Sequence, residues 1–231
     1  MCDPMCSDYR IVVLELRFRI AGGKYECGRI AAALQKRCDA APYERFVVAL
    51  SVEKAAPRGF HETDALAKGY PGGRIFDLLS ATVELKWAAL LSLRLQRCGI
   101  SAVGLNIHEA GVQLVSQDSN VNAQIRVEVR WLQDALLENY VVVVPGSFAT
   151  NAVGSIVSLG PNGADLSAAV LAQKLDADRW EMIRSVSGGV VCDPHNAKTK
   201  PSGNSQFTVN SVAFQIATEA RIPLLVRDLE R

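Results

Sequence analysis

The residues best suited to chemistry follow a run of four consecutive valines, Val141–Val144. Such a run indicates a strand that is buried on both faces, as strands of parallel sheets are. The sequence SLGPNGAD, residues 158–165, comes soon after it and joins a glycine-rich turn to the start of an alanine-rich helix. A helix N-terminus presents free backbone N–H groups that favour an anion. We therefore expect an anionic group to bind near Asn162, Gly163 and Asp165.

A second polar pair, His108 and Glu109, follows an expected short strand at 100–105. Open α/β sheets bind their ligands at the ends of strands. An imidazole beside a carboxylate at such a place can act as an acid–base pair or contact a substrate. A loop pair exposed to water is the alternative, which the sequence leaves open.

Alternating strand-like and helix-like segments would position these groups. Apolar runs indicate strands at 10–20, 45–51, 100–105, 141–144 and 180–183. Apolar spacing of three and four residues indicates helices at 27–37, 74–96, 125–137 and 167–178. A polar hairpin is expected after Pro145-Gly146, and a surface loop at 61–73. We predict the α/β class: a flexible leader at 1–9, then a single three-layer α/β/α domain over 10–231 with a mainly parallel sheet of roughly six to eight strands.

The composition excludes several classes of function. A net charge of +1 gives no electrostatic argument for binding nucleic acid or a membrane surface. No apolar run approaches the roughly 20 residues of a spanning helix, and the N-terminus lacks the basic start and apolar core of a secretory signal. Six scattered cysteines form no zinc-binding pattern, so we expect reduced thiols and a cytoplasmic location.

The order of these segments resembles the catalytic domain of aspartate kinases, within the amino-acid kinase family. That family has a buried strand ending in P-G-F or A-G-F, a T-L-G-R-G-G-S-D turn, an alanine-rich helix and the segment S-D-V-D-G-V-Y-T-A-D-P-R. The counterparts here are VVVVPGS, SLGPNGAD, LSAAVLAQKLDAD and IRSVSGGVVCDPH. The resemblance extends to a final helix and strand near the chain end. It implies an amino-acid kinase-like fold and a homodimer, here expected without the regulatory ACT domains.

The family has a phosphate-contacting lysine and two glycines where the first strand ends, and this sequence departs from that pattern. One alignment places Glu15 at the lysine and Arg17 at the first glycine, whereas the other places Ile20 at the lysine. Neither recovers the lysine. If phosphate binds, Arg17, Arg19 or Lys24 would have to replace it; otherwise these residues are ordinary solvent-facing cations.

Other positions of the family site also differ. Pro161 replaces an arginine that grips the substrate carboxylate, and Ser147 replaces the aromatic residue at the substrate end of the central strand. Glu84 lies one residue beyond the family's glutamate. One residue rotates a helical side chain by about 100°, so Glu84 is expected to point elsewhere unless the helix is shifted. Asp165 is kept, either as a contact to ligand or Mg²⁺, or as a helix cap.

The segment that lies against the nucleotide in the family is changed as well. Its two aspartates are Ser185 and Ser187 here, while Asp193-Pro194 is kept and Lys198 follows. If a nucleotide binds, these five residues are the expected contacts.

We therefore predict an aspartate-kinase-like small-molecule enzyme whose phosphotransfer residues are largely lost. It would act in biosynthesis on an amino-acid-like metabolite, without ATP or another cofactor. Two alternatives stay open: a divergent carboxylate kinase that uses ATP and Mg²⁺, and a non-catalytic dimer partner or regulatory subunit. No metal ligands are predicted. The predicted catalytic residues are His108, Glu109, Ser147 and Asp165. The predicted substrate-binding residues are Gly146, Ser147, Phe148, Asn162, Gly163, Arg17, Arg19 and Lys24.

Overall fold

The computed structural model describes residues 9–19, 24–53, 73–115, 125–183, 190–192 and 209–227. For 18–19, 24–26, 53 and 190–192 only the backbone is described. The expected leader, apart from residue 9, and the loop expected at 61–73, apart from residue 73, lie outside these ranges.

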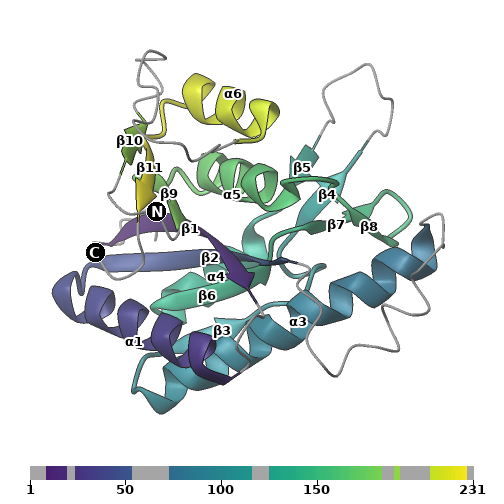
Figure 1. Cartoon of the computed structure of the whole chain (residues 1–231). Coiled ribbons are helices and arrows are strands. Elements are labelled where there is room, and N and C mark those ends of the chain that lie inside the picture. Colours follow the sequence, from purple (N-terminus) through teal and green to yellow (C-terminus); the bar gives the residue numbers. More distant parts are fainter. Residues whose placement is uncertain are drawn as a thin grey trace, which may run out of the picture.

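A seven-stranded sheet forms the centre of the molecule (Figure 1). Its order is β10-β11-β9-β1-β2-β6-β3, and every neighbouring pair is parallel except β10 with β11. The prediction of a mainly parallel sheet of this size is confirmed. The strands are β1 (Arg10–Arg19), β2 (Glu44–Glu53), β3 (Ala102–Gly104), β6 (Val141–Pro145), β9 (Arg179–Ile183), β10 (Val190–Cys192) and β11 (Leu224–Arg227).

Helices cover both faces of this sheet, which gives the predicted three layers (Figure 1). One apolar cluster joins helices α1 (Lys24–Ala40) and α3 (Arg74–Arg97) to one face of the sheet. Another cluster joins α4 (Arg130–Glu138), α5 (Gly163–Lys174) and α6 (Ser211–Glu219) to the opposite face. Alternate residues along each buried strand point to opposite faces, and this is how one strand supplies both clusters.

A second, four-stranded sheet has the order β5-β4-β7-β8. It contains β4 (Val112–Leu114), β5 (Ile125–Val127), β7 (Phe148–Asn151) and β8 (Ile156–Ser158). The antiparallel pair of β7 and β8 is the predicted hairpin. The helix predicted at 125–137 is wrong in its first part, because 125–127 pairs with β4 and the helix begins only at Arg130. Pairing with β4 outweighs the local helical spacing there.

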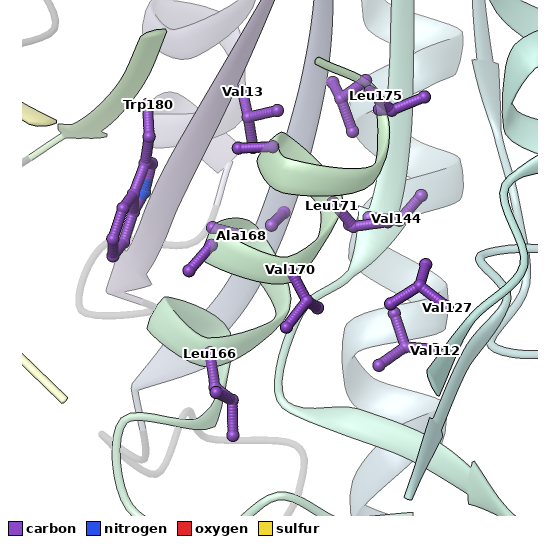
Figure 2. Close-up of a cluster of buried hydrophobic side chains, with 14 of the residues drawn as sticks. Val13, Val112, Val127, Val144, Leu166, Ala168, Val170, Leu171, Leu175 and Trp180 are labelled. Carbon is purple, nitrogen blue, oxygen red and sulfur yellow. The ribbon is translucent and has the colours of Figure 1, made fainter. Parts of the chain in front are cut away.

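Helix α5 lies between the two sheets (Figure 2). Val144 of the main sheet lies near Leu171, whereas Val112 and Val127 of the second sheet lie near Val170. Every residue from Gly163 to Ala172 is buried. The many alanines of this helix let it approach both sheets closely, so the N-terminus of α5 and the glycine turn before it are held in a fixed place.

Candidate functional site

The site is built where the parallel strands β1, β2 and β6 end. Arg17 lies opposite Ser51, and Leu50 lies opposite Pro145. The carboxyl ends of these strands therefore share one edge of the sheet, which is where open α/β sheets bind ligands. The glycine turn and the N-terminus of α5 reach the same edge, because the side chain of Arg17 contacts both.

Arg17 connects three groups at this edge. Its Nη2 donates to Asn162 Oδ1 at 2.8 Å and to Asp165 Oδ1 at 3.0 Å, and its Nε donates to Glu15 Oε1 at 3.3 Å. The side chain of Arg17 is 23% exposed, whereas the carboxylates of Glu15 and Asp165 are fully buried. Burial alone would lower the pKa of Arg17, but the two carboxylates and their hydrogen bonds outweigh it and raise that pKa. The guanidinium therefore stays charged.

Asp165 is not at the N-cap position of its own helix. The N-cap position of α5 is Asn162, which has a left-handed backbone (φ 55°) and makes no side-chain cap bond. Asp165 Oδ1 accepts from Arg17, and Oδ2 accepts from the backbone N–H of Asn210 at 2.9 Å. Asn210 in turn caps α6. The hydrogen bonds of its carboxylate link β1, α5 and α6, and both roles considered for Asp165 stay predictions.

Glu84 is the residue that the sequence analysis placed wrongly. It lies on α3, it is 3% exposed, and its carboxylate accepts from Val52 N–H at 3.2 Å and from Ser147 N–H at 3.0 Å. The side chain therefore points at the ends of β2 and β6, not away from them. Burial raises the pKa of Glu84 to about 7, although hydrogen bonds from Ser147, Val52 and Gly146 oppose the rise.

A signal for Glu84 was present in the sequence. The buried residues of α3 include Ala81, Glu84, Ala88, Leu91 and Leu95, which follow a spacing of three and four residues. A glutamate inside such an apolar stripe must either have a partner or change its pKa, since burying a bare charge is very unfavourable. A prediction that placed this stripe of α3 against the sheet would have made Glu84 a buried residue.

The residues after β6 are shaped by close packing. A Cβ at Gly146 would lie 3.0 Å from the Cβ of Ala164 and from the carbonyl oxygen of Leu50. Only glycine therefore lets the end of β6 meet the start of α5 without a shift. The carbonyl of Ser147 accepts from Leu159 N–H at 3.0 Å, which ties the strand end to the glycine turn. Phe148 is buried in a small apolar cluster with Ala81 and Ile107, so its side chain serves the core.

The glycine turn also needs its glycine. A Cβ at Gly163 would lie 2.6 Å from the Cβ of Leu159. Gly160 has a φ of 77°, a left-handed conformation that favours glycine.

His108 and Glu109 lie in a turn after β3. His108 is exposed, and the Asn106 side chain accepts from the N–H groups of both His108 and Glu109. Glu109 Oε2 accepts from Asn106 N–H at 2.8 Å. Both of these hydrogen bonds of Glu109 stay inside its own turn, and a catalytic role for the pair stays a prediction.

For several other predicted site residues, the structure does not describe the side chain. Arg19 is the last residue of β1 and Lys24 is the first residue of α1. The five expected nucleotide contacts, Ser185, Ser187, Asp193, Pro194 and Lys198, fall outside the described residues. In the part of the chain that the structure describes, no group of three or more His, Cys, Asp or Glu side chains is arranged for a metal ion. Over the same residues, no helix has the length and apolar character to cross a membrane.

Comparison with known proteins gives a consistent family relationship. The model of the amino acid kinase family matches residues 20–202. Aspartokinase of Helicobacter pylori is 34% identical over 160 residues, which are 69% of this chain and 39% of that protein. Aspartokinase of Thermus thermophilus is 33% identical over 141 residues, which are 58% of this chain and 35% of that protein. The chain thus spans less than half the length of these curated relatives.

Solved structures agree on the fold. Aspartate kinase from Synechocystis gives a TM-score of 0.71 at 25% identity, covering 96% of this chain and 38% of that one. Escherichia coli aspartokinase III in complex with aspartate and ADP gives 0.66 at 16% identity, covering 95% and 62%. UMP kinase from Ureaplasma parvum gives 0.60 at 14% identity, covering 96% and 91%.

These comparisons overturn one expectation. The sequence analysis predicted chemistry without any cofactor, yet the curated relatives are aspartokinases and aspartokinase III is solved with ADP. The prediction of no cofactor is therefore wrong. Its basis was the expected loss of several phosphotransfer residues, the lysine among them. The structure shows a charged Arg17 at the carboxyl edge of the sheet.

Proposed function

The chain belongs to the amino acid kinase family, and we propose that it uses ATP to phosphorylate the carboxylate of an amino acid that resembles aspartate. In this reaction a carboxylate oxygen of the substrate forms a bond to the γ-phosphorus, the bond from that phosphorus to the bridging oxygen breaks, and ADP leaves. The products are an acyl phosphate and ADP. The similarity to aspartokinases over 69% of this chain supports the substrate class.

The observation that carries the proposal is the position of Arg17. Phosphoryl transfer depends on positive charge held against the phosphates. Arg17 is charged, it is partly exposed, and it is hydrogen-bonded to Asn162 and Asp165 at the glycine turn. It therefore replaces the lysine that neither sequence alignment recovers. Arg17 also brings a guanidinium to the turn in which Pro161 replaces an arginine.

The glycine turn and the start of α5 are suited to the phosphates of ATP. Gly146 and Gly163 keep backbone close together where side chains would clash. The N–H groups of Gly163 and Asp165 already donate to the carbonyls of Gly160 and Asn162, so the support for phosphate binding is the positive end of the helix dipole. Mg²⁺ bound with ATP offsets the phosphate charge. Both carboxylate oxygens of Asp165 already accept hydrogen bonds, from Arg17 and from Asn210 N–H, so we propose that Asp165 orients the guanidinium of Arg17 beside the turn.

The amino acid is proposed to bind between neighbouring strand ends. Ser147 follows β6, and the turn with His108 and Glu109 follows β3, which is paired with β6. These three residues are the proposed substrate contacts. The exposed imidazole of His108 is free to approach a ligand from the solvent side.

We extend the proposal to the assembly and the location of the protein. Ile75, Leu78 and Leu93 of α3 are 67%, 47% and 55% exposed, so this helix presents apolar side chains to the surface. We propose that α3 contributes to a homodimer, which light scattering of the purified chain would test. Cys27, Cys38 and Cys98 are free thiols, which is typical of a cytoplasmic protein.

A second candidate function rests on Glu15. This residue is a fully buried carboxylate at the lysine position of one alignment, and it pairs with Arg17. A carboxylate there opposes the negative phosphates. The observation favours a family member that binds nucleotide and amino acid without turnover, as a regulatory partner of an active kinase.

Calorimetric titration with Mg²⁺-ATP and then aspartate, followed by an assay for ADP release, tests both functions. Saturable binding with aspartate-dependent ADP release supports the kinase, whereas binding without release supports the regulatory partner. The variant Arg17→Gln should lose nucleotide binding by tenfold or more, roughly the loss of one charged hydrogen bond. Arg10→Gln is the matched control, since Arg10 lies on the same strand and its side chain is 63% exposed. Absence of any binding at millimolar ligand would contradict both functions.

A further inference from the structure

Glu84 joins three elements that are far apart in the sequence. From α3 its two carboxylate oxygens accept separate hydrogen bonds, one from Val52 in β2 and one from Ser147 just after β6. The strands β2 and β6 are direct neighbours in the sheet. A single side chain therefore bridges two adjacent strand ends at the edge where the substrate is proposed to bind.

We propose that Glu84 is a positioning residue whose carboxylate fixes the ends of β2 and β6, so that its protonation releases Ser147 and loosens the amino-acid site. The carboxylate accepts at both oxygens, and each hydrogen bond to a charged acceptor is stronger than a neutral one. A protonated carboxyl keeps one good acceptor and turns the other oxygen into a donor. It cannot hold both N–H groups equally well.

The surroundings of Glu84 make this switch local. Among the described residues, the groups that oppose the rise in its pKa are the N–H groups of Val52, Gly146 and Ser147 and the hydroxyl of Ser147, all of them neutral. Along α3 itself, the residues one turn away are Ser80, Ala81, Trp87 and Ala88, none of them charged. On β2, the charged residue closest in sequence to Val52 is Glu53, which follows it directly. Burial, which raises the pKa of Glu84 to about 7, brings its protonation into the physiological range.

The predicted effect on amino-acid binding rests on the proposed function. The predicted effect on the ends of β2 and β6 does not. Amide resonances of Val52 and Ser147, followed by ¹⁵N NMR between pH 5.5 and 8.5, read the two hydrogen bonds directly. We expect both amides to titrate together with a midpoint at about pH 7, and we expect Glu84→Gln to abolish this titration. Asp77→Asn is the matched control, because Asp77 also lies on α3 and accepts from a backbone N–H, that of Ser158 at 3.2 Å. It should leave the titration unchanged.

Independent midpoints for the two amides, or a titration that persists in Glu84→Gln, would overturn the proposal. If Glu84→Gln fails to fold, the wild-type titration and its agreement with the side-chain carboxyl signal of Glu84 still decide the matter. Calorimetry supplies the functional readout: aspartate should bind about tenfold more weakly at pH 6 than at pH 8, because only the fraction with charged Glu84 is competent. Absence of aspartate binding at every pH would refute the proposed function and leave the amide titration to decide on Glu84.

Discussion

Two side chains, the partly exposed Arg17 and the buried Glu84, carry most of what is specific to this site. Each of them contacts a residue that is far away in the sequence. Arg17 reaches Asp165 across 148 positions of sequence, and Glu84 reaches Ser147 across 63. Both lie at the edge of the sheet where the parallel strands β1, β2 and β6 end. Small changes at either residue should therefore affect both stability and binding.

Replacement of Arg17 should destabilise the fold. In Arg17→Gln the buried carboxylates of Glu15 and Asp165 lose their contact with the guanidinium, and breaking such a buried pair costs about 3 kcal/mol. Urea denaturation at pH 7 measures this loss. Arg10→Gln, at the exposed start of the same strand, should change the free energy of unfolding by less than about 0.5 kcal/mol. Equal effects of the two variants would contradict the role given to Arg17.

Glu84 should make stability depend on pH. Its pKa is raised from 4.5 to about 7 in the folded protein, so the folded state binds the proton more readily than the unfolded state. The resulting stability is fully present below pH 4.5 and is lost as the pH rises through 7. The total effect is up to about 3 kcal/mol. Denaturation curves of the wild type and Glu84→Gln, compared at several pH values, isolate this contribution. A difference that does not change with pH would contradict it.

This cost coincides with the role proposed for Glu84. The charged form of Glu84 is unfavourable because of its burial, yet it is the form that accepts from both Val52 and Ser147. Functional sites often hold such unfavourable groups, which the rest of the fold must stabilise.

Among the elements, the turn between β3 and β4 shows how one glycine fixes a connection. Gly111 has a φ of 73°, and a Cβ there would lie 1.8 Å from the carbonyl oxygen of Glu128. The clash is with backbone, which cannot rotate away. The turn that carries His108 and Glu109 is thereby held against the segment between β5 and α4.

Gly111→Ala should therefore destabilise the protein by about 3 kcal/mol or more, as the sum of backbone strain and overpacking. Gly154→Ala is the matched control, because Gly154 has a similar φ of 77° but no atom within 4 Å of the added Cβ. It should lose only about 1 kcal/mol from backbone strain. Thermal and urea denaturation of both variants measure the difference. Similar losses would show that the close approach at Gly111 is relieved by a small movement.

At the scale of the whole molecule, α5 packs against both sheets. Its apolar neighbours come from the main sheet and from the second sheet, and a single buried cluster includes both (Figure 2). The second sheet is small, and short sheets gain stability mainly from what they pack against. We expect it to unfold with the rest of the molecule.

Leu171→Ala tests this expectation. Leu171 is fully buried, and such a truncation typically costs 2–5 kcal/mol. Native-state hydrogen exchange should show the same loss of protection for Val13 and Val144 as for Val112 and Val127. Leu137→Ala on α4, where the side chain is 54% exposed, should change little and serves as the control. A loss confined to the main sheet would show that the second sheet opens by itself.

Much of this architecture could be predicted from local sequence. Continuous apolar runs gave the strands β1, β2, β6 and β9, and the parallel three-layer arrangement followed from their alternation with helices. The second sheet was missed apart from its hairpin. Strands of three residues, such as β4 and β5, carry too little periodicity to be distinguished from helix or loop.

The sequence by itself determined the fold class and the glycine turn before α5. These are properties of neighbouring residues, and local spacing is enough to reveal them. Only the tertiary structure decided what the charged residues do: that Arg17 faces Asp165, and that Glu84 points inward to Val52 and Ser147. Burial and hydrogen-bond partners depend on strands and helices that meet in space from distant positions, and no local pattern specifies those meetings.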